Sequence, residues 1–443
     1  MSETATLVLG VVVVAAAIVL VARQYDVRLI LVLAALALGG LAGDVTPIVR
    51  TFLQTLSNEQ FVLPICTAMG FAQVLRHSGC DQHLVHLLVR PIRTVRPLLI
   101  PGAVVIGFVV NASVISQAST AVAVGTVLVP LLRSARLTAT TIGAALLLGS
   151  SLGGELVNPG APELNTIARA TKTDPTVVVP HVVPLLLVQL AVATTIFWLL
   201  SSRAERRAPD DERVEETFDE SEFRINPFKA VVPVVPLVLL MVVGPPFELL
   251  TIPRHWLVVE GQGGSFGTRL IGASMLFGTA LAALASPPKA PDAAKVFFEG
   301  AGLALTRIVS VIVSAQCFGK GIEQLHLDDP IRELILVRPD LVWSLSAGVT
   351  LAFAALCGSG MAATQSLYGF YINSEMSLGL MLRVGAVTSI AAAAGRTMTP
   401  VAAVVLTSAE LTDSKPLAIA RRVAVPLLVA TTVTVLVAWY RGG

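Results

Sequence analysis

Three charged residues lie inside two proline-containing interruptions of apolar sequence. Glu155 and Glu163 belong to the first interruption, residues 154–163, and Arg396 belongs to the second, residues 395–400. A charge in apolar surroundings is costly, so such residues indicate a functional site. Arg396 is suited to hold a carboxylate through two parallel hydrogen bonds, which a lysine cannot form. Glu163 is a candidate site for a coupling proton or cation.

Two interpretations of Arg396 stay open. It binds a substrate carboxylate, or it forms a structural ion pair with Glu155, and the two roles can coexist. The prolines explain the interruptions themselves, because Pro159 and Pro162 remove backbone donors and open a helix. The freed backbone groups need partners, and a substrate or an ion can be one; a simple kink is the other interpretation.

Small polar clusters mark two further places in the apolar sequence, residues 116–120 and 357–361. If a helix ends and another begins there, the new helix offers free N–H groups to a carboxylate. The ending helix offers carbonyls to Na⁺, although small residues also ease helix packing. The predicted substrate-binding residues are Ser116, Gln117, Ser119, Thr120, Asn158, Ser359, Gly360, Thr364, Arg396, Thr397 and Thr399. The predicted coupling-ion or ion-pair residues are Glu155, Glu163 and Asn165.

A fixed offset of 241 residues relates these features to one another. It pairs Gly154 with Gly395, Thr171 with Thr412, Pro175 with Pro416, Trp198 with Trp439, and the two polar clusters with each other. Position 155 is Glu where its counterpart, position 396, is Arg. Two related halves, each with a polar interruption, predict an inverted-repeat carrier with its site between the halves.

The composition predicts an all-α polytopic membrane protein. Of 443 residues, 54% are hydrophobic and 14% are charged, against about 25% charged in soluble proteins. The net charge of +2 gives no argument for nucleic acid. The run from Met1 to Ala22 is interpreted as a retained membrane helix, and the four cysteines as buried free thiols. No metal, cofactor or nucleotide-binding motif is predicted, so ATP is not the energy source and Na⁺ or H⁺ is the expected coupling ion.

The apolar runs predict about ten spans and two re-entrant hairpins. The predicted order is N-terminal helices in 1–60, repeat 1 in 61–200, a cytoplasmic linker at 201–229, connecting helices in 230–290 and repeat 2 in 291–443. Repeat 1 contains a hairpin at 98–133 and a broken helix at 138–170; repeat 2 contains a hairpin at 341–373 and a broken helix at 378–410. With the N-terminus outside, most loop arginines and lysines fall inside. The two hairpins then enter from opposite sides, which makes the repeats inverted.

Three elements resemble those of the DcuC family of anaerobic C4-dicarboxylate carriers in the ion transporter superfamily. Residues 395–405 (GRTMTPVAAVV) are similar to the family's GRTLSPV-type element, and residues 355–360 (ALCGSG) resemble its GSG element. Pro159-Gly-Ala-Pro-Glu163 resembles a Pro-x-x-x-Asp element, with Glu for Asp. The chain departs from the pattern at Met361 and Ala363 and in its first polar cluster. The resemblance implies a carrier of succinate, fumarate or malate, often dimeric, in the bacterial cytoplasmic (inner) membrane.

The sequence therefore predicts a secondary active transporter of dicarboxylates, with the lipid bilayer and a small dianion as its partners. A carrier of another anion, or a cation/proton antiporter on the same scaffold, is the alternative. An intramembrane enzyme is disfavoured because no catalytic dyad or metal pair is evident.

Overall fold

The chain is helical throughout the part that the computed structural model describes. That part comprises residues 3–23, 25–92, 95–209, 223–244, 248–258, 265–327, 329–338, 340–373 and 375–442, and it contains no strand. Residues 210–222 of the predicted linker lie outside it. The all-α fold class is confirmed.

The N-terminal helices are α1 (Glu3–Ala22), α2 (Val27–Leu41), α3 (Thr46–Leu56), α4 (Glu59–Ser78) and α5 (Cys80–Val89). The first functional segment contains α6 (Leu99–Ser113), α7 (Gln117–Ser134), α8 (Ala139–Ser151), the 3-10 turn η2 (Gly154–Val157), α9 (Pro162–Thr171) and α10 (Pro175–Glu205). The middle contains α11 (Pro227–Val231), η4 (Val232–Val234), α12 (Val235–Val243), α13 (Phe266–Ala285), α14 (Ala293–Ala304), the π-helical segment η7 (Leu305–Val309) and α15 (Ser310–Gln324). The last part contains α16 (Asp329–Val337), α17 (Leu341–Cys357), α18 (Gly360–Tyr371), α19 (Leu378–Met398), α20 (Ala403–Thr412) and α21 (Pro416–Gly442).

Within the described residues, six helical stretches are long and apolar enough to cross a membrane by length and composition: Ala139–Thr171, Pro175–Glu205, Phe266–Ala285, Pro287–Gln324, Leu378–Met398 and Pro416–Arg441. Shorter apolar helices, such as α2, α6 and α17, accompany them. The two stretches that contain the site are 89% and 72% buried within the protein, whereas the other four are 33–44% buried. The site-bearing helices are therefore central, and the others surround them.

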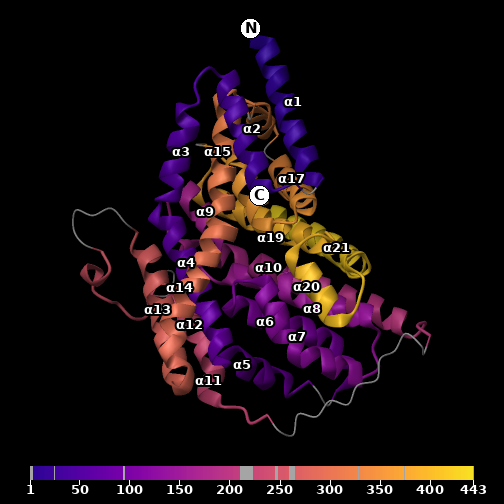
Figure 1. Cartoon of the computed structure of the whole chain (residues 1–443). Helices are drawn as coiled ribbons and strands as arrows, with labels where there is room; N and C mark the ends of the chain where they lie inside the picture. Colours follow the sequence, from indigo (N-terminus) through magenta and orange to yellow (C-terminus); the bar gives the residue numbers. More distant parts are fainter. Residues whose placement is uncertain are drawn as a thin grey trace.

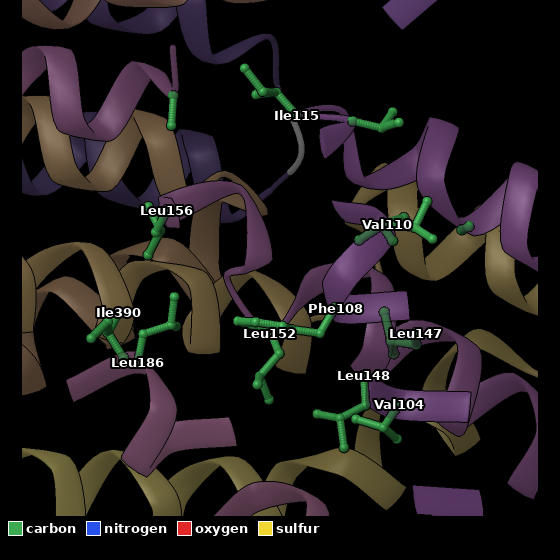
Figure 2. Close-up of a cluster of buried hydrophobic side chains, with 14 of the residues drawn as sticks. Val104, Phe108, Val110, Ile115, Leu147, Leu148, Leu152, Leu156, Leu186 and Ile390 are labelled. Atoms are coloured by element: carbon green, nitrogen blue, oxygen red, sulfur yellow. The ribbon is translucent and has the colours of Figure 1, made fainter. Parts of the chain in front are cut away.

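Two apolar cores hold this arrangement together. The larger core joins α4–α10 with α13, α14 and α17–α21, and the smaller one joins α1, α2, the start of α4 and α15. In Figure 1, α1 and α2 lie at the end of the molecule that carries the N-terminus, and α5 lies near the opposite end. Figure 2 shows Leu152 and Leu156, which both follow the end of α8, close to Leu186 of α10 and Ile390 of α19. The first break is thus packed from two neighbouring helices.

Helix boundaries follow the 241-residue offset that the sequence contains. The bounds of α9, moved by 241 residues, coincide with those of α20, and the starts of α10 and α21 coincide in the same way. Both short helices end in a left-handed residue, Lys172 with φ 54° and Asp413 with φ 52°. The offset therefore relates folded elements as well as residue types.

The first break is stabilised by side-chain amides. Asn158 Nδ2 donates to the Ala112 carbonyl, and Asn165 Nδ2 donates to the carbonyls of Pro159 and Ala161. Irregular backbone inside a membrane protein persists only where such partners satisfy it. Gly153, with φ 114°, supplies the turn into η2 that other residues rarely adopt.

The structure differs from the predicted elements in three places. Helix α3 was not predicted, because its polar residues mask a short amphipathic helix. Repeat 2, predicted to begin at residue 291, begins inside a longer helical run, Pro287–Gln324, that contains the π-helical segment. The predicted linker starts inside a helix, since α10 continues to Glu205.

Gly395 permits a close approach of α19 to α17. A Cβ atom at this position would lie 2.2 Å from the Leu351 carbonyl oxygen, whereas one at Gly348 of α17 would meet nothing within 4 Å. We expect Gly395→Ala to lower the free energy of unfolding by about 1–3 kcal/mol through overpacking. Thermal melting of purified protein in detergent is the measurement, with Gly348→Ala as the control. Equal melting temperatures for the two variants would contradict this account.

Candidate functional site

A buried ion pair joins the two breaks. Arg396 Nη2 lies 2.9 Å from Glu155 Oε1, and its Nη1 lies 3.9 Å from Glu163 Oε1. The three side chains are at most 7% exposed. The structural ion pair considered from the sequence is therefore present, between residues that the 241-residue offset makes equivalent.

Further hydrogen bonds fix the arginine. Arg396 Nη2 donates to the Ser151 carbonyl at 3.0 Å, and Thr397 Oγ1 donates to the same carbonyl at 2.9 Å. Gln117 Nε2 donates to Glu155 Oε1 at 2.8 Å. The Glu155 carboxylate and the Ser151 carbonyl thus connect the end of α8 with the end of α19 and the start of α7.

A cavity of about 220 Å³ opens beside this network. We name it the central cavity. Its wall contains residues from both polar clusters and both breaks, together with Met69 of α4 and Arg307 and Ile308 of η7. Segments that are distant in sequence therefore meet at one small volume.

Four helices begin at the central cavity. Lining residues come from the first turns of α7, α9, α18 and α20. Ser116 and Ser359 cap α7 and α18, whereas α9 and α20 have no side-chain cap. Each N-terminus carries roughly half a positive charge, so four of them supply about two. With two arginines in the same wall, the cavity is suited to an anion.

Six of the predicted residues line the central cavity: Ser116, Gln117, Glu163, Ser359, Gly360 and Arg396. Eight lie outside its wall: Ser119, Thr120, Glu155, Asn158, Asn165, Thr364, Thr397 and Thr399. Several of these hold backbone or neighbouring side chains. Thr120 donates to the Val114 carbonyl, Thr364 donates to the Gly360 carbonyl, and Ser119 accepts from Arg76.

Arg307 is the lining residue that the sequence analysis missed. It is exposed, lies in the π-helical segment and makes no hydrogen bond or ion pair with any described residue. π-helical turns occur frequently at functional sites. The available signal was a single arginine within the apolar run of residues 296–318. The 241-residue offset did not point to it, because the counterpart of Arg307 is Cys66.

The Glu155 carboxylate also has an oxygen atom without a hydrogen-bond partner. Its Oε1 accepts from both Arg396 and Gln117, whereas Oε2 is buried and has no hydrogen-bond partner. A buried carboxylate oxygen without a partner is costly. An incoming proton or cation would be stabilised at this oxygen.

The apolar helices define a multi-pass helical membrane protein, and the central cavity with its charged residues lies among them. The family model described as C4-dicarboxylate anaerobic carrier, DcuC, matches residues 59–440. The chain therefore belongs to the DcuC family, which confirms the resemblance carried by residues 355–360 and 395–405.

Two relatives illustrate the range of similarity. The anaerobic C4-dicarboxylate transporter DcuC of Escherichia coli K12 is 22% identical over 420 residues, covering 89% of this chain and 83% of the relative. A putative uncharacterized transporter of Haemophilus influenzae is 32% identical over 136 residues, covering 31% of this chain and 94% of the relative.

Neutralising Glu155 should destabilise the protein because it leaves Arg396 buried with only the more distant Glu163. We expect Glu155→Gln to cost about 3 kcal/mol, the scale of breaking a buried ion pair. Asp413→Asn is the control, since Asp413 pairs with Arg133 at 3.1 Å but is 87% exposed, and such pairs contribute at most about 1 kcal/mol. Melting in detergent compares the two, and an equal loss would show that the buried pair is not a major stabilising contact.

Proposed function

We propose that the protein is a secondary active carrier of C4-dicarboxylates such as succinate, fumarate and malate in the bacterial cytoplasmic membrane. The observation that carries the proposal is the central cavity, where two arginines and four helix N-termini meet. Membership of the DcuC family supports the substrate class. The volume of about 220 Å³ suits a small ligand, because pockets for drug-sized ligands measure about 300–1,000 Å³.

Binding would use the two arginines differently. Arg396 is already held by Glu155, so it is oriented before a ligand arrives, and it would hold one carboxylate with Ser359 and Gly360 nearby. Arg307 has no described partner and would hold the second carboxylate. The predicted hydroxyl and amide contacts of Ser116 and Gln117 belong to the same proposal. Thr397 and Thr399 would position Arg396 rather than touch the substrate.

Coupling to a cation follows from charge. Among the side chains, Arg396 and Arg307 balance Glu155 and Glu163, so the negative charge of a dianion would be offset only by the partial charges of the helix N-termini. A proton or Na⁺ at Glu163 would reduce this excess, and entry of substrate would then require entry of the cation. Asn165 would support Glu163 from the same helix, α9.

Alternating access would follow from the two halves. We propose that they are inverted repeats, that α6–α7 and α17–α18 are the re-entrant hairpins, and that these hairpins move as units against the other helices. The shared helix boundaries at the 241-residue offset support the duplication. The meeting of Glu155 with Arg396 is the contact expected of equivalent residues at a pseudo-two-fold axis. A homodimer belongs to this proposal by analogy with the superfamily.

The role of Arg396 is tested by substrate flux. In proteoliposomes, we expect Arg396→Gln to lower uptake of labelled succinate at least tenfold, because a charged hydrogen-bond donor to the carboxylate is lost. Arg338→Gln, at an exposed arginine that pairs with Asp340, should transport normally. Unchanged succinate flux in Arg396→Gln would refute the binding role, and ion exchange without any succinate dependence would favour the antiporter.

The role of Arg307 is tested by selectivity. If it holds the second carboxylate, Arg307→Gln should weaken competition by succinate by about tenfold or more, the scale of one charge-assisted hydrogen bond. Competition by a C4 monocarboxylate such as butyrate should change little. The measurement is inhibition of residual succinate exchange by each acid. Equal weakening for both acids would show that Arg307 does not distinguish the second carboxylate.

The role of Glu163 is tested by separating exchange from accumulation. The glutamine side chain of Glu163→Gln cannot gain or lose a proton. We therefore expect gradient-driven accumulation of succinate to be abolished while succinate–succinate exchange continues. Imposed pH and Na⁺ gradients, applied separately, identify the coupling ion in the unmodified protein. Accumulation that survives in Glu163→Gln would place the coupling site elsewhere.

A further inference from the structure

A second and larger cavity, of about 460 Å³, lies away from the central cavity between α3, α9, α15 and α18. Its polar wall includes Thr166, Arg169, Lys320, Glu323, Gln365 and Ser366. We name this cavity the α9–α18 vestibule. None of its residues belongs to the site described above.

The vestibule and the central cavity share two helices. Helix α9 presents Glu163 to the central cavity and Thr166 and Arg169 to the vestibule. Helix α18 presents Met361 to the first and Gln365 to the second. Thr166 lies about one turn from each of Glu163 and Arg169, and Gln365 lies about one turn from Met361. At about 1.5 Å per residue, Glu163 and Arg169 are about 9 Å apart along α9, so the two cavities follow one another along the same pair of helices.

The vestibule contains buried polar groups without partners. Both amide atoms of Gln365, the hydroxyl of Ser366 and Nη1 of Arg169 are buried and make no hydrogen bond. Gln365 and Ser366 are only 6% and 5% exposed. Buried polar groups in native proteins are almost always satisfied, so a cluster of exceptions among the residues that line one cavity requires an explanation. A polar ligand in the vestibule would supply the missing partners.

The charges in the wall select the ligand. Lys320 pairs with Glu323 at 3.1 Å, which leaves Arg169 as the cation of the wall without an acidic partner among the described residues. Its guanidinium lies 4.8 Å from the centre of the Phe61 ring, which fixes its position without using its N–H donors. Guanidinium, amide and hydroxyl donors together match a carboxylate.

We propose that the α9–α18 vestibule is a second carboxylate-binding site, where Arg169, Gln365 and Ser366 hold an anion before it passes along α9 and α18 to the central cavity. The inference rests on the proposed carrier function for its role in transport, but the binding itself does not. Because one cation serves the vestibule, a monocarboxylate should bind there as well as a dicarboxylate. Selection for two carboxylates is left to the central cavity.

The corresponding place in the other half is filled. The offset pairs Gln365 with Val124, which is fully buried, and Ser366 with Gly125. A Cβ atom at Gly125 would lie 3.0 Å from Leu411 Cδ1 and 3.2 Å from Leu146 Cδ2. Arg169 corresponds to Glu410. The anion site therefore lies in the α9–α18 vestibule and has no counterpart between α7 and α20. In this conformation, anions would enter the pathway from the vestibule.

A cysteine beside Arg169 tests the proposal. Ala170 lines the vestibule and is exposed, so Ala170→Cys is introduced after Cys66, Cys80, Cys317 and Cys357 are replaced by alanine. Labelling of the purified protein by N-ethylmaleimide is followed with succinate or acetate at matched ionic strength. By competition, a ligand at about ten times its Kd should slow labelling about tenfold.

Three added substitutions locate the protection. Arg169→Gln should abolish it, whereas Lys320→Gln, which removes a rim charge already paired with Glu323, should preserve it. Arg396→Gln should also preserve it, since the vestibule does not need the central cavity. Protection that is lost in Arg396→Gln, or retained in Arg169→Gln, would overturn the inference by tracing the effect to the central site. No protection by either acid in the starting protein would overturn it too, while succinate flux would still judge the carrier function separately.

Discussion

The buried Arg396–Glu155 pair is the contact on which the rest of the site depends. Two helices are broken beside it, and each break would expose backbone groups that apolar surroundings cannot satisfy. Arg396 reaches across to Glu155 and to the Ser151 carbonyl, so it closes one broken helix against the other. Because removing either charge leaves the other buried without its close partner, the pair holds the two breaks in one geometry.

That geometry also creates the cavity. A helix that ends and restarts inside the protein presents a new N-terminus, and here four such starts converge. Their partial charges favour an anion without adding side-chain charges that would need partners of their own. The carboxylates of Glu155 and Glu163 offset the arginines, so an empty site need not hold a large net charge.

The sequence predicted the broken helices and the buried charges because both violate ordinary rules for apolar segments. Pro159, Pro162 and Pro400 cannot continue a helix, and Arg396 cannot lie in lipid without a partner. Arg307 was missed because it becomes a site residue only through the residues of other helices that line the central cavity with it. The sequence around Arg307 does not show that packing. The separation of lining residues from supporting ones, such as Ser359 from Thr397, likewise depends on tertiary packing. The vestibule was not predictable, since Gln365 and Arg169 are 196 residues apart and ordinary in type.

Opposite charges at equivalent positions explain how a duplicated chain could acquire this site. Residues related by the offset that meet at an axis would carry like charges if the halves were identical, and two buried like charges repel strongly. Because Glu155 lies opposite Arg396, the two side chains attract each other and form an ion pair. Arg169 and Glu410 show the same reversal of charge elsewhere, where Arg169 lines a cavity and Glu410 is exposed. The Glu155–Arg396 contact is therefore one place where a difference between positions related by the offset is electrostatic and stabilises the structure.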